Sequence, residues 1–155
     1  MTSMDPTRDL DLVVFDCDGV LVDSGRLTVE VEARMLTEMG WPITLGLAGL
    51  RPLFEGRIYS GSEVARGKRW PDLFVYAARS MGAEPRRCAV IEDSINGARA
   101  ANAAGMSCYG FAGGLTRRAD LEATGATVFD TMAELRLLLV DTGCAGGVHE
   151  AETQL

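Results

Sequence analysis

The sequence predicts an α/β fold in which a parallel sheet is covered by helices on both faces. Short apolar segments alternate along the chain with longer segments of helical periodicity. The apolar segments, such as Leu12–Phe15 and Cys88–Ile91, lack the apolar–polar alternation of a sheet with one solvated face. Glycine occupies 18 of the 155 positions, which indicates many tight turns.

The first part of the chain predicts one strand and one helix. Leu12–Phe15 is predicted to be a strand buried on both faces. Ser24 can cap a helix over residues 25–39, which Gly40 ends. The segment 41–56 mixes proline and glycine with apolar residues and gives no assignment.

From residue 57 onward the sequence predicts regular alternation of strands and helices. The predicted strands are Arg57–Ser60, Cys88–Ile91, Ser107–Phe111 and Ala126–Phe129. The predicted helices begin at Pro71, at Ser94 and after the capping-box pattern Thr131–Glu134; the first two end at Gly82 and Gly105. Together these elements predict one α/β core over residues 1–142, followed by a flexible tail over 143–155.

Composition and charge exclude several classes of protein. A net charge of −7 argues against a nucleic-acid binder, and no apolar run approaches the roughly 20 residues of a membrane span. The polar, acidic start of the chain does not resemble a signal peptide, so a cytoplasmic location is expected. The four cysteines (Cys17, Cys88, Cys108 and Cys144) form no C-x-x-C pair and the single histidine is His149, so buried reduced thiols are expected rather than a zinc site.

Acidic residues follow two of the predicted strands. Asp16 and Asp18 come after the first strand, and Glu92 and Asp93 come after the Cys88–Ile91 strand. Ligands of parallel sheets bind beyond the carboxyl ends of the strands, where these four carboxylates would converge. Hard oxygen ligands without histidine or cysteine favour Mg²⁺. The alternative is that the acids are solvated loop residues or helix caps, and for Asp93 and Ser94 the two interpretations have equal weight.

Several motifs resemble those of the haloacid dehalogenase-like hydrolase superfamily, with residues typical of its β-phosphoglucomutase-like phosphatases. Asp16–Ser24 (DCDGVLVDS) resembles the first motif, and Gly67–Phe74 (GKRWPDLF) resembles the lysine motif. Ile91–Gly97 (IEDSING) resembles the acidic motif, and Ala103–Met106 resembles the helix end that follows it. The resemblance implies a Rossmann-like core and a Mg²⁺-dependent phosphatase of small phosphorylated metabolites of the sugar-phosphate class.

The resemblance also implies roles for individual residues. Asp16 would be the nucleophile that forms an aspartyl-phosphate, and Asp18 would act as general acid and base. Asp16, the Asp18 carbonyl and Asp93 would hold Mg²⁺, with Glu92 nearby. Lys68 would offer a positive charge to the phosphate and to Asp16.

Phosphate contacts are also expected from residues beside these groups. Gly19 follows the two aspartates and Ser94 follows the acidic pair, so we expect both, with Lys68, to bind the phosphate.

The sequence departs from the family between the first two motifs. Only 52 positions (68 − 16) separate Asp16 from Lys68. Relatives place there a helical cap domain and a strand ending in a phosphate-binding serine or threonine, and residues 25–44 resemble only a remnant of the cap. We therefore expect the first strand to pair directly with Arg57–Ser60, weak and poorly selective activity, and self-association through exposed sheet surface.

Three other functions compete with hydrolysis. A β-phosphoglucomutase-like phosphomutase would need a cap residue to manage its bisphosphate intermediate. A catalytically impaired remnant would bind metal or a partner without turnover. A phospho-acceptor signalling domain also gathers acids and a lysine at a sheet edge. The order of the motifs favours the hydrolase over this domain, because Gly19 directly follows the two aspartates and Lys68 precedes Glu92 in the chain.

Overall fold

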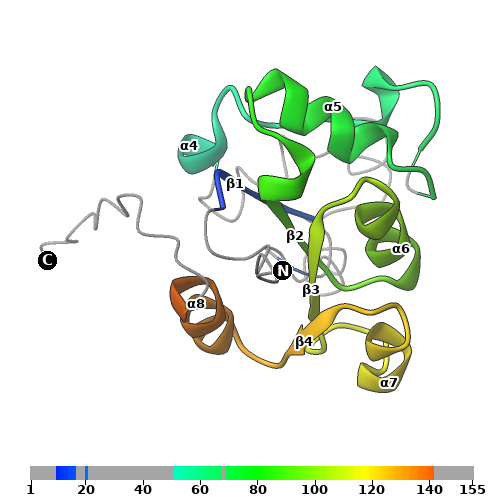
Figure 1. Cartoon of the computed structure of the whole chain (residues 1–155), viewed down its shortest axis with the longest axis vertical. Coiled ribbons are helices and arrows are strands. Elements are labelled where there is room, and N and C mark those ends of the chain that lie inside the picture. Colours follow the sequence, from blue (N-terminus) through cyan, green and yellow to red (C-terminus); the bar gives the residue numbers. More distant parts are fainter. Residues whose placement is uncertain (1–9, 17–19, 21–50, 68, 142–155) are drawn as a thin grey trace, which may run out of the picture.

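A four-stranded parallel sheet lies at the centre of the computed structural model, which describes residues 10–16, 20, 51–67 and 69–141 (Figure 1). The strands lie in chain order across the sheet: β1 (Leu12–Phe15), β2 (Cys88–Glu92), β3 (Ser107–Phe111) and β4 (Thr127–Phe129). The helices are α4 (Arg51–Phe54), α5 (Asp72–Ser80), α6 (Ile95–Ala103), α7 (Arg118–Glu122) and α8 (Met132–Asp141), with short 3₁₀ helices η1 (Gly61–Glu63) and η2 (Pro85–Arg87). The α/β architecture predicted from the sequence is confirmed.

Helices cover both faces of the sheet because successive strand residues point to opposite sides. One cluster packs α5 and α6 against one face through Phe74, Ala78, Cys88, Val90, Ala98, Ala100, Ala101, Met106, Cys108 and Ala126. The other packs α8 against the opposite face through Leu10, Val20, Ala89, Ile91, Tyr109, Phe129 and Leu135. Figure 1 shows α5, α6 and α7 on one side of the strands and α8 on the other.

The central strand β2 is buried along its whole length, whereas β1 is only half-buried. All five residues of β2 are buried because β1 and β3 pair with it on either side. Among the described residues, β1 pairs with β2 alone, and its four residues are partly exposed. The predicted strand at Leu12–Phe15 is confirmed. Both of its faces pack against the core, Leu12 and Val14 on one side and Val13 and Phe15 on the other, although each residue stays partly exposed.

The predicted strand at Arg57–Ser60 is wrong. Residues 57–60 are irregular and lead into η1. Ser60 caps η1, since its hydroxyl accepts a hydrogen bond from the Ser62 amide at 3.3 Å while Glu63 accepts one from the Ser60 amide. This local capping box uses backbone groups that a strand would pair with its neighbour. The expected direct pairing of this segment with the first strand is wrong for the same reason.

Helices α5 and α6 lie where the sequence predicted them. Pro71 stands at the start of α5 and Gly82 follows its end, with Phe74 among the residues it buries. Ser94 caps α6 by accepting a hydrogen bond from an amide of its first turn. Buried small residues on α6 bring it close to the sheet.

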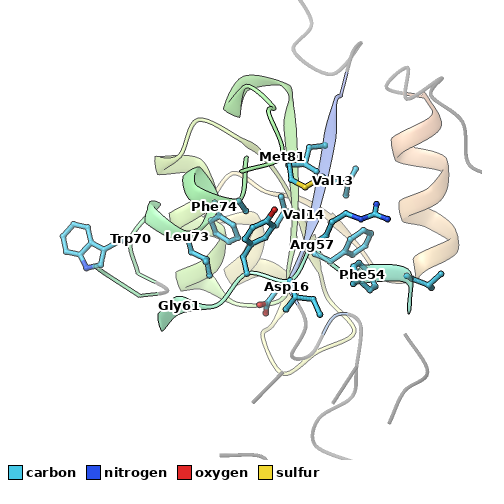
Figure 2. Close-up of a pocket in the computed structure, with 16 residues that line it drawn as sticks. Val13, Val14, Asp16, Phe54, Arg57, Gly61, Trp70, Leu73, Phe74 and Met81 are labelled. Atoms are coloured by element: carbon cyan, nitrogen blue, oxygen red, sulfur yellow. The ribbon is translucent and has the colours of Figure 1, made fainter. Parts of the chain in front are cut away.

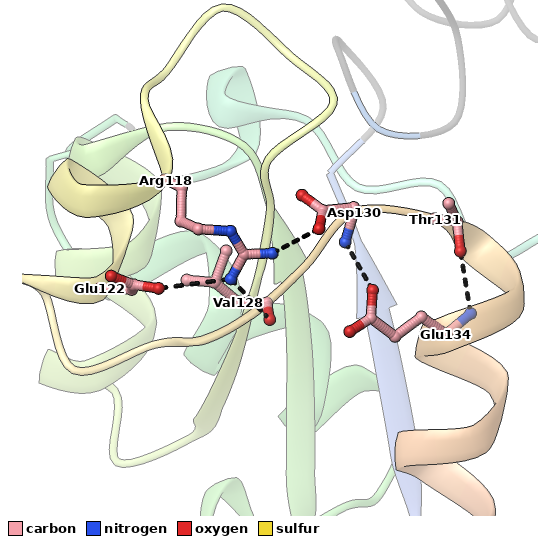
Figure 3. A network of polar contacts seen from close by, with 6 residues as sticks. All are labelled: Arg118, Glu122, Val128, Asp130, Thr131 and Glu134. Atoms are coloured by element: carbon pink, nitrogen blue, oxygen red, sulfur yellow. Dashed lines mark hydrogen bonds and ion pairs between the residues drawn. The ribbon is translucent and has the colours of Figure 1, made fainter.

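An arginine joins α7 to β4 (Figure 3). The Arg118 guanidinium donates to Asp130 at 2.7 Å, to Glu122 at 3.3 Å and to the Val128 carbonyl at 3.5 Å. These contacts link a helix to the strand end that follows it in the chain. The Asp130 carboxylate, and secondarily that of Glu122, raises the pKa of Arg118.

The start of α8 carries a variant of the predicted capping box. The Thr131 hydroxyl accepts from the Glu134 amide at 3.2 Å, as predicted. The Glu134 carboxylate accepts instead from the Asp130 amide at 2.8 Å, one residue before the expected partner (Figure 3). The helix start is therefore fixed at both Asp130 and Thr131.

Several predictions fall on residues that the structure does not describe. The helix over 25–39, the cap remnant at 25–44 and the tail at 143–155 lie outside the described residues. Within the described part, Cys88 and Cys108 are free, buried thiols, as predicted. None of the described helices has the length and apolar character needed to cross a bilayer.

Candidate active site

Three carboxylates meet at the carboxyl ends of β1 and β2. The parallel register sets Phe15 beside Ile91, and the Asp16 amide donates to the Ile91 carbonyl at 2.9 Å. Asp16 therefore lies next to Glu92 and Asp93, and one carboxylate oxygen from each of the three lies within 4.8 Å of the others. The convergence that the sequence predicted for these three residues is present in the fold.

Glu92 is fully buried and is held by the start of α6. Its Oε2 accepts hydrogen bonds from the Ser94 amide at 2.9 Å and from the Ser94 hydroxyl at 2.7 Å. The Ser94 hydroxyl in turn accepts from the Gly97 amide at 3.1 Å. A Cβ added at Gly97 would overlap the Glu92 carboxylate. Gly97 thus makes room for a charged group inside the fold, a role that the sequence reasoning missed although its motif contains this glycine.

A second glycine brings another loop against Asp93. A turn follows β3, and a Cβ added at Gly114 would lie 2.8 Å from Asp93 Oδ2. A side chain at this position would push the Asp93 carboxylate away from its neighbours. Nothing local in the sequence shows that the turn at Gly113–Gly114 reaches the end of β2.

The cluster has the chemistry of a site for a hard divalent cation. Carboxylates this close repel one another unless a cation joins them, and the described members offer oxygen ligands only. The Glu92 side chain is buried away from solvent, whereas Asp16 and Asp93 are half-buried and partly exposed to solvent. The donor set fits Mg²⁺ better than zinc, which prefers nitrogen and sulfur ligands.

The other predicted site residues are placed only in part. Asp18, Gly19 and Lys68 lie outside the described residues. The Ser94 hydroxyl contacts Glu92 and the Gly97 amide, so its expected phosphate contact stays a prediction.

Described residues before position 68 contact described residues after it. Arg66 makes a two-pronged contact with Asp72, with N–O distances of 2.9 and 2.8 Å, and its guanidinium lies 4.4 Å from the centre of the Trp70 ring. This arginine lowers the pKa of Asp72. The Trp70 amide also donates to the Gly67 carbonyl at 2.9 Å. These contacts connect Arg66 and Gly67 to the residues at the start of α5.

A cavity of about 520 Å³ runs along β1 and reaches Asp16 (Figure 2). Its walls are β1, helix α4 with the chain that follows it, and one side of α5. Figure 2 shows Met81 near one end of β1 and Asp16 near the other. The lining residues are Leu12, Val13, Val14, Phe15, Asp16, Leu53, Phe54, Arg57, Ile58, Tyr59, Gly61, Trp70, Leu73, Phe74, Ala77 and Met81.

Comparison with known proteins points to one family of hydrolases. The family model for haloacid dehalogenase-like hydrolase matches residues 34–105. A conserved haloacid dehalogenase-like protein of unknown function from Agrobacterium tumefaciens superposes with a TM-score of 0.68 and 25% identity, over 85% of this chain and 98% of that chain. Over these residues the chain resembles haloacid dehalogenase-like hydrolases. The resemblance stated from the motifs is thereby confirmed.

Two further similar proteins are connected with phosphate chemistry. A family hydrolase from Deinococcus radiodurans R1, solved with bound phosphate and sodium, has a TM-score of 0.62 and 41% identity, over 65% of this chain and 47% of that chain. Fructose-1-phosphate phosphatase YqaB from Escherichia coli K12 is 41% identical over 58 residues, which are 37% of this chain and 30% of that protein. The chain spans 24%, 34% and 30% of the lengths of the first three curated relatives that it matches.

Proposed function

We propose that this chain is a Mg²⁺-dependent phosphoric monoester hydrolase that acts on a small phosphorylated metabolite through an aspartyl-phosphate. The observation that carries the proposal is the meeting of Asp16, Glu92 and Asp93 within 4.8 Å at the carboxyl ends of adjacent parallel strands. The family-model match and phosphatase-named relatives support the reaction class. The cytoplasmic location and the small-molecule partner expected from the sequence belong to the same proposal.

The chain's own residues would perform two displacements at phosphorus. In the first, a carboxylate oxygen of Asp16 forms a bond to phosphorus, the ester bond breaks, and Asp18 gives its proton to the leaving oxygen. In the second, water attacks the aspartyl-phosphate, its proton returns to Asp18, and the bond between Asp16 and phosphorus breaks to release inorganic phosphate. Lys68 would neutralise phosphate charge in both steps.

Asp16, Glu92, Asp93 and the Asp18 carbonyl are the residues that would hold Mg²⁺. The bound cation supplies positive charge that offsets repulsion between the Asp16 carboxylate and the anionic ester. The Glu92–Ser94 hydrogen bonds would keep one acidic side chain fixed while Asp16 reacts.

The sequence predicts a sugar-phosphate substrate class, and the fructose-1-phosphate phosphatase relative supports that choice. A relative solved with bound phosphate supports a phosphate site in this fold. The remnant hypothesis stays an alternative that turnover has to test. No described residue favours the phosphomutase over the hydrolase.

Mg²⁺ binding and phosphate release together test the proposal. Isothermal titration should detect Mg²⁺ binding to the full chain, and the Asp16→Ala and Asp93→Ala variants should lose it. Glu84→Gln, an exposed acid remote from the cluster, is the matched control and should bind normally. Unchanged binding in both aspartate variants would overturn the metal assignment.

Turnover separates the hydrolase from the remnant. A panel of phosphate esters should release phosphate with Mg²⁺ present. Asp16→Asn should abolish release because an amide cannot form the aspartyl-phosphate, and Asp18→Asn should slow it by about 10²–10⁴-fold. Metal binding without any release would favour the remnant, and full activity in Asp16→Asn would show that the nucleophile lies elsewhere.

A further inference from the structure

The cavity beside β1 joins directly to the candidate nucleophile. Asp16 belongs to its lining, and the wall formed by β1 (Leu12–Phe15) is roughly 13 Å long at about 3.3 Å per residue. Its volume of about 520 Å³ lies within the usual range for small-molecule sites, about 300–1,000 Å³. A phosphate held at Asp16 would therefore carry its organic group beside or into this cavity.

The lining favours an apolar organic group. Among the described residues that line the cavity, only Asp16 and Arg57 carry charge, and both are outnumbered by aliphatic and aromatic side chains. Phe54 packs edge-on against Phe15, with ring centres 6.4 Å apart, and Tyr59 packs edge-on against Tyr76 at 5.6 Å. These contacts hold aromatic rings in place along the wall. The hydroxyl groups of a sugar would lose hydration here and find few polar partners.

We propose that the cavity is the leaving-group site, and that it selects phosphate monoesters whose organic part is apolar and aromatic. This inference rests on the proposed hydrolase function, and it replaces the sugar phosphates expected from the sequence with esters of an apolar aromatic alcohol. It also replaces the expectation of poor selectivity, because the described core offers a recognition surface of its own. Val14, Leu73 and Phe74 supply the apolar contact, and Asp16 fixes the position of the phosphorus.

A series of primary alkyl phosphates tests the selectivity with leaving groups of comparable chemistry. The substrates are ethyl phosphate, glucose 6-phosphate and 3-phenylpropyl phosphate, each assayed with Mg²⁺ and the full chain. Burial of a phenyl group should give 3-phenylpropyl phosphate a kcat/KM about tenfold or more above the other two. An equal or lower value would overturn the inference.

Variants of the lining connect any preference to this cavity. Ala77→Leu should fill the cavity from α5 and lower the kcat/KM of the phenylpropyl ester to about that of ethyl phosphate. Ala103→Leu, at an exposed position on α6, is the matched control and should keep the preference. If Ala77→Leu does not fold, Leu73→Gln makes the same wall polar and should lower the preference. A preference that survives in the folded variant would overturn the assignment.

Binding of a neutral probe separates this inference from the proposed function. Isothermal titration with 3-phenylpropan-1-ol, which has no phosphate, should show binding to the wild-type chain and to Ala103→Leu but not to Ala77→Leu. Such binding without hydrolysis of any ester would refute the proposed function while supporting the cavity as an apolar site. Hydrolysis of the esters without binding of the alcohol would refute the inference and leave the hydrolase standing.

Discussion

The Ser94 hydroxyl donates a 2.7 Å hydrogen bond to the buried carboxylate of Glu92 and also caps helix α6. One side chain therefore holds an acidic group at the end of β2 and sets where the next helix begins. This coupling explains how a carboxylate can be fully buried beside two other acids, since hydrogen bonds from the chain replace the water that it loses.

Replacing Ser94 tests this double role. Ser94→Ala removes the cap of α6 and one donor to Glu92, so the free energy of unfolding should fall by about 1–3 kcal/mol. Urea denaturation measures the change. Ser80→Ala, at an exposed position near the end of α5, should change it by less than about 0.5 kcal/mol. Equal effects in the two variants would show that the Glu92 contact contributes nothing.

Gly97→Ala should destabilise the protein although alanine is the better helix former. Alanine within a helix normally gains about 0.5–1 kcal/mol over glycine. Here the added Cβ would overlap the Glu92 carboxylate and displace it from Ser94. We expect a loss of about 2 kcal/mol or more in thermal or urea unfolding. Gly67→Ala is the control, because no atom lies within 4 Å of a Cβ there; a stabilised Gly97→Ala protein would contradict the packing described.

Gly114→Ala should weaken metal binding more than it weakens the fold. The new methyl group would stand 2.8 Å from Asp93 Oδ2 and displace a proposed ligand. Mg²⁺ affinity should fall about tenfold or more by isothermal titration, as it does when groups that orient metal ligands are changed. The neighbouring Leu115→Ala changes a fully exposed side chain and should leave the affinity unaltered. Unaltered affinity in Gly114→Ala as well would refute this positioning role.

Alkaline pH should destabilise the protein through Cys108. Burial, and secondarily the Glu92 carboxylate, raises the pKa of this thiol from 9.0 to about 12. The folded state thus keeps the proton to a higher pH than the unfolded state, so the stabilisation is complete below pH 9 and is lost as pH rises toward 12.

Urea unfolding at several pH values checks this effect. Over that window the free energy of unfolding should fall by up to about 1.4 kcal/mol per pH unit from this group. Cys108→Ala should show a shallower fall, whereas Cys88, which stays in both proteins, contributes equally to each. Parallel pH profiles of the two proteins would exclude Cys108 as the cause.

The predictable part of the fold consists of elements whose signals are local. Cys88–Ile91 is apolar at every position and becomes the buried strand β2. Ser94 and Gly105 mark the ends of α6 because caps and turns depend on a few neighbouring residues. The Arg57–Ser60 prediction failed because an apolar pair suggested a strand, while Ser60 and Glu63 close a capping box instead. Pattern alone does not rank these two local alternatives.

The sequence by itself determined the α/β class, the four strands of the described sheet, and the placement of Asp16, Glu92 and Asp93 after strands. Parallel strands with helical crossovers bring their carboxyl ends to one edge, so chain order suffices to predict that these acids meet. The tertiary structure alone decided that Gly114 lies against Asp93, that Gly97 makes room for Glu92, and that an apolar cavity follows β1 to Asp16. These features depend on distances between side chains far apart in the chain, and such distances are set by packing rather than by periodicity or spacing.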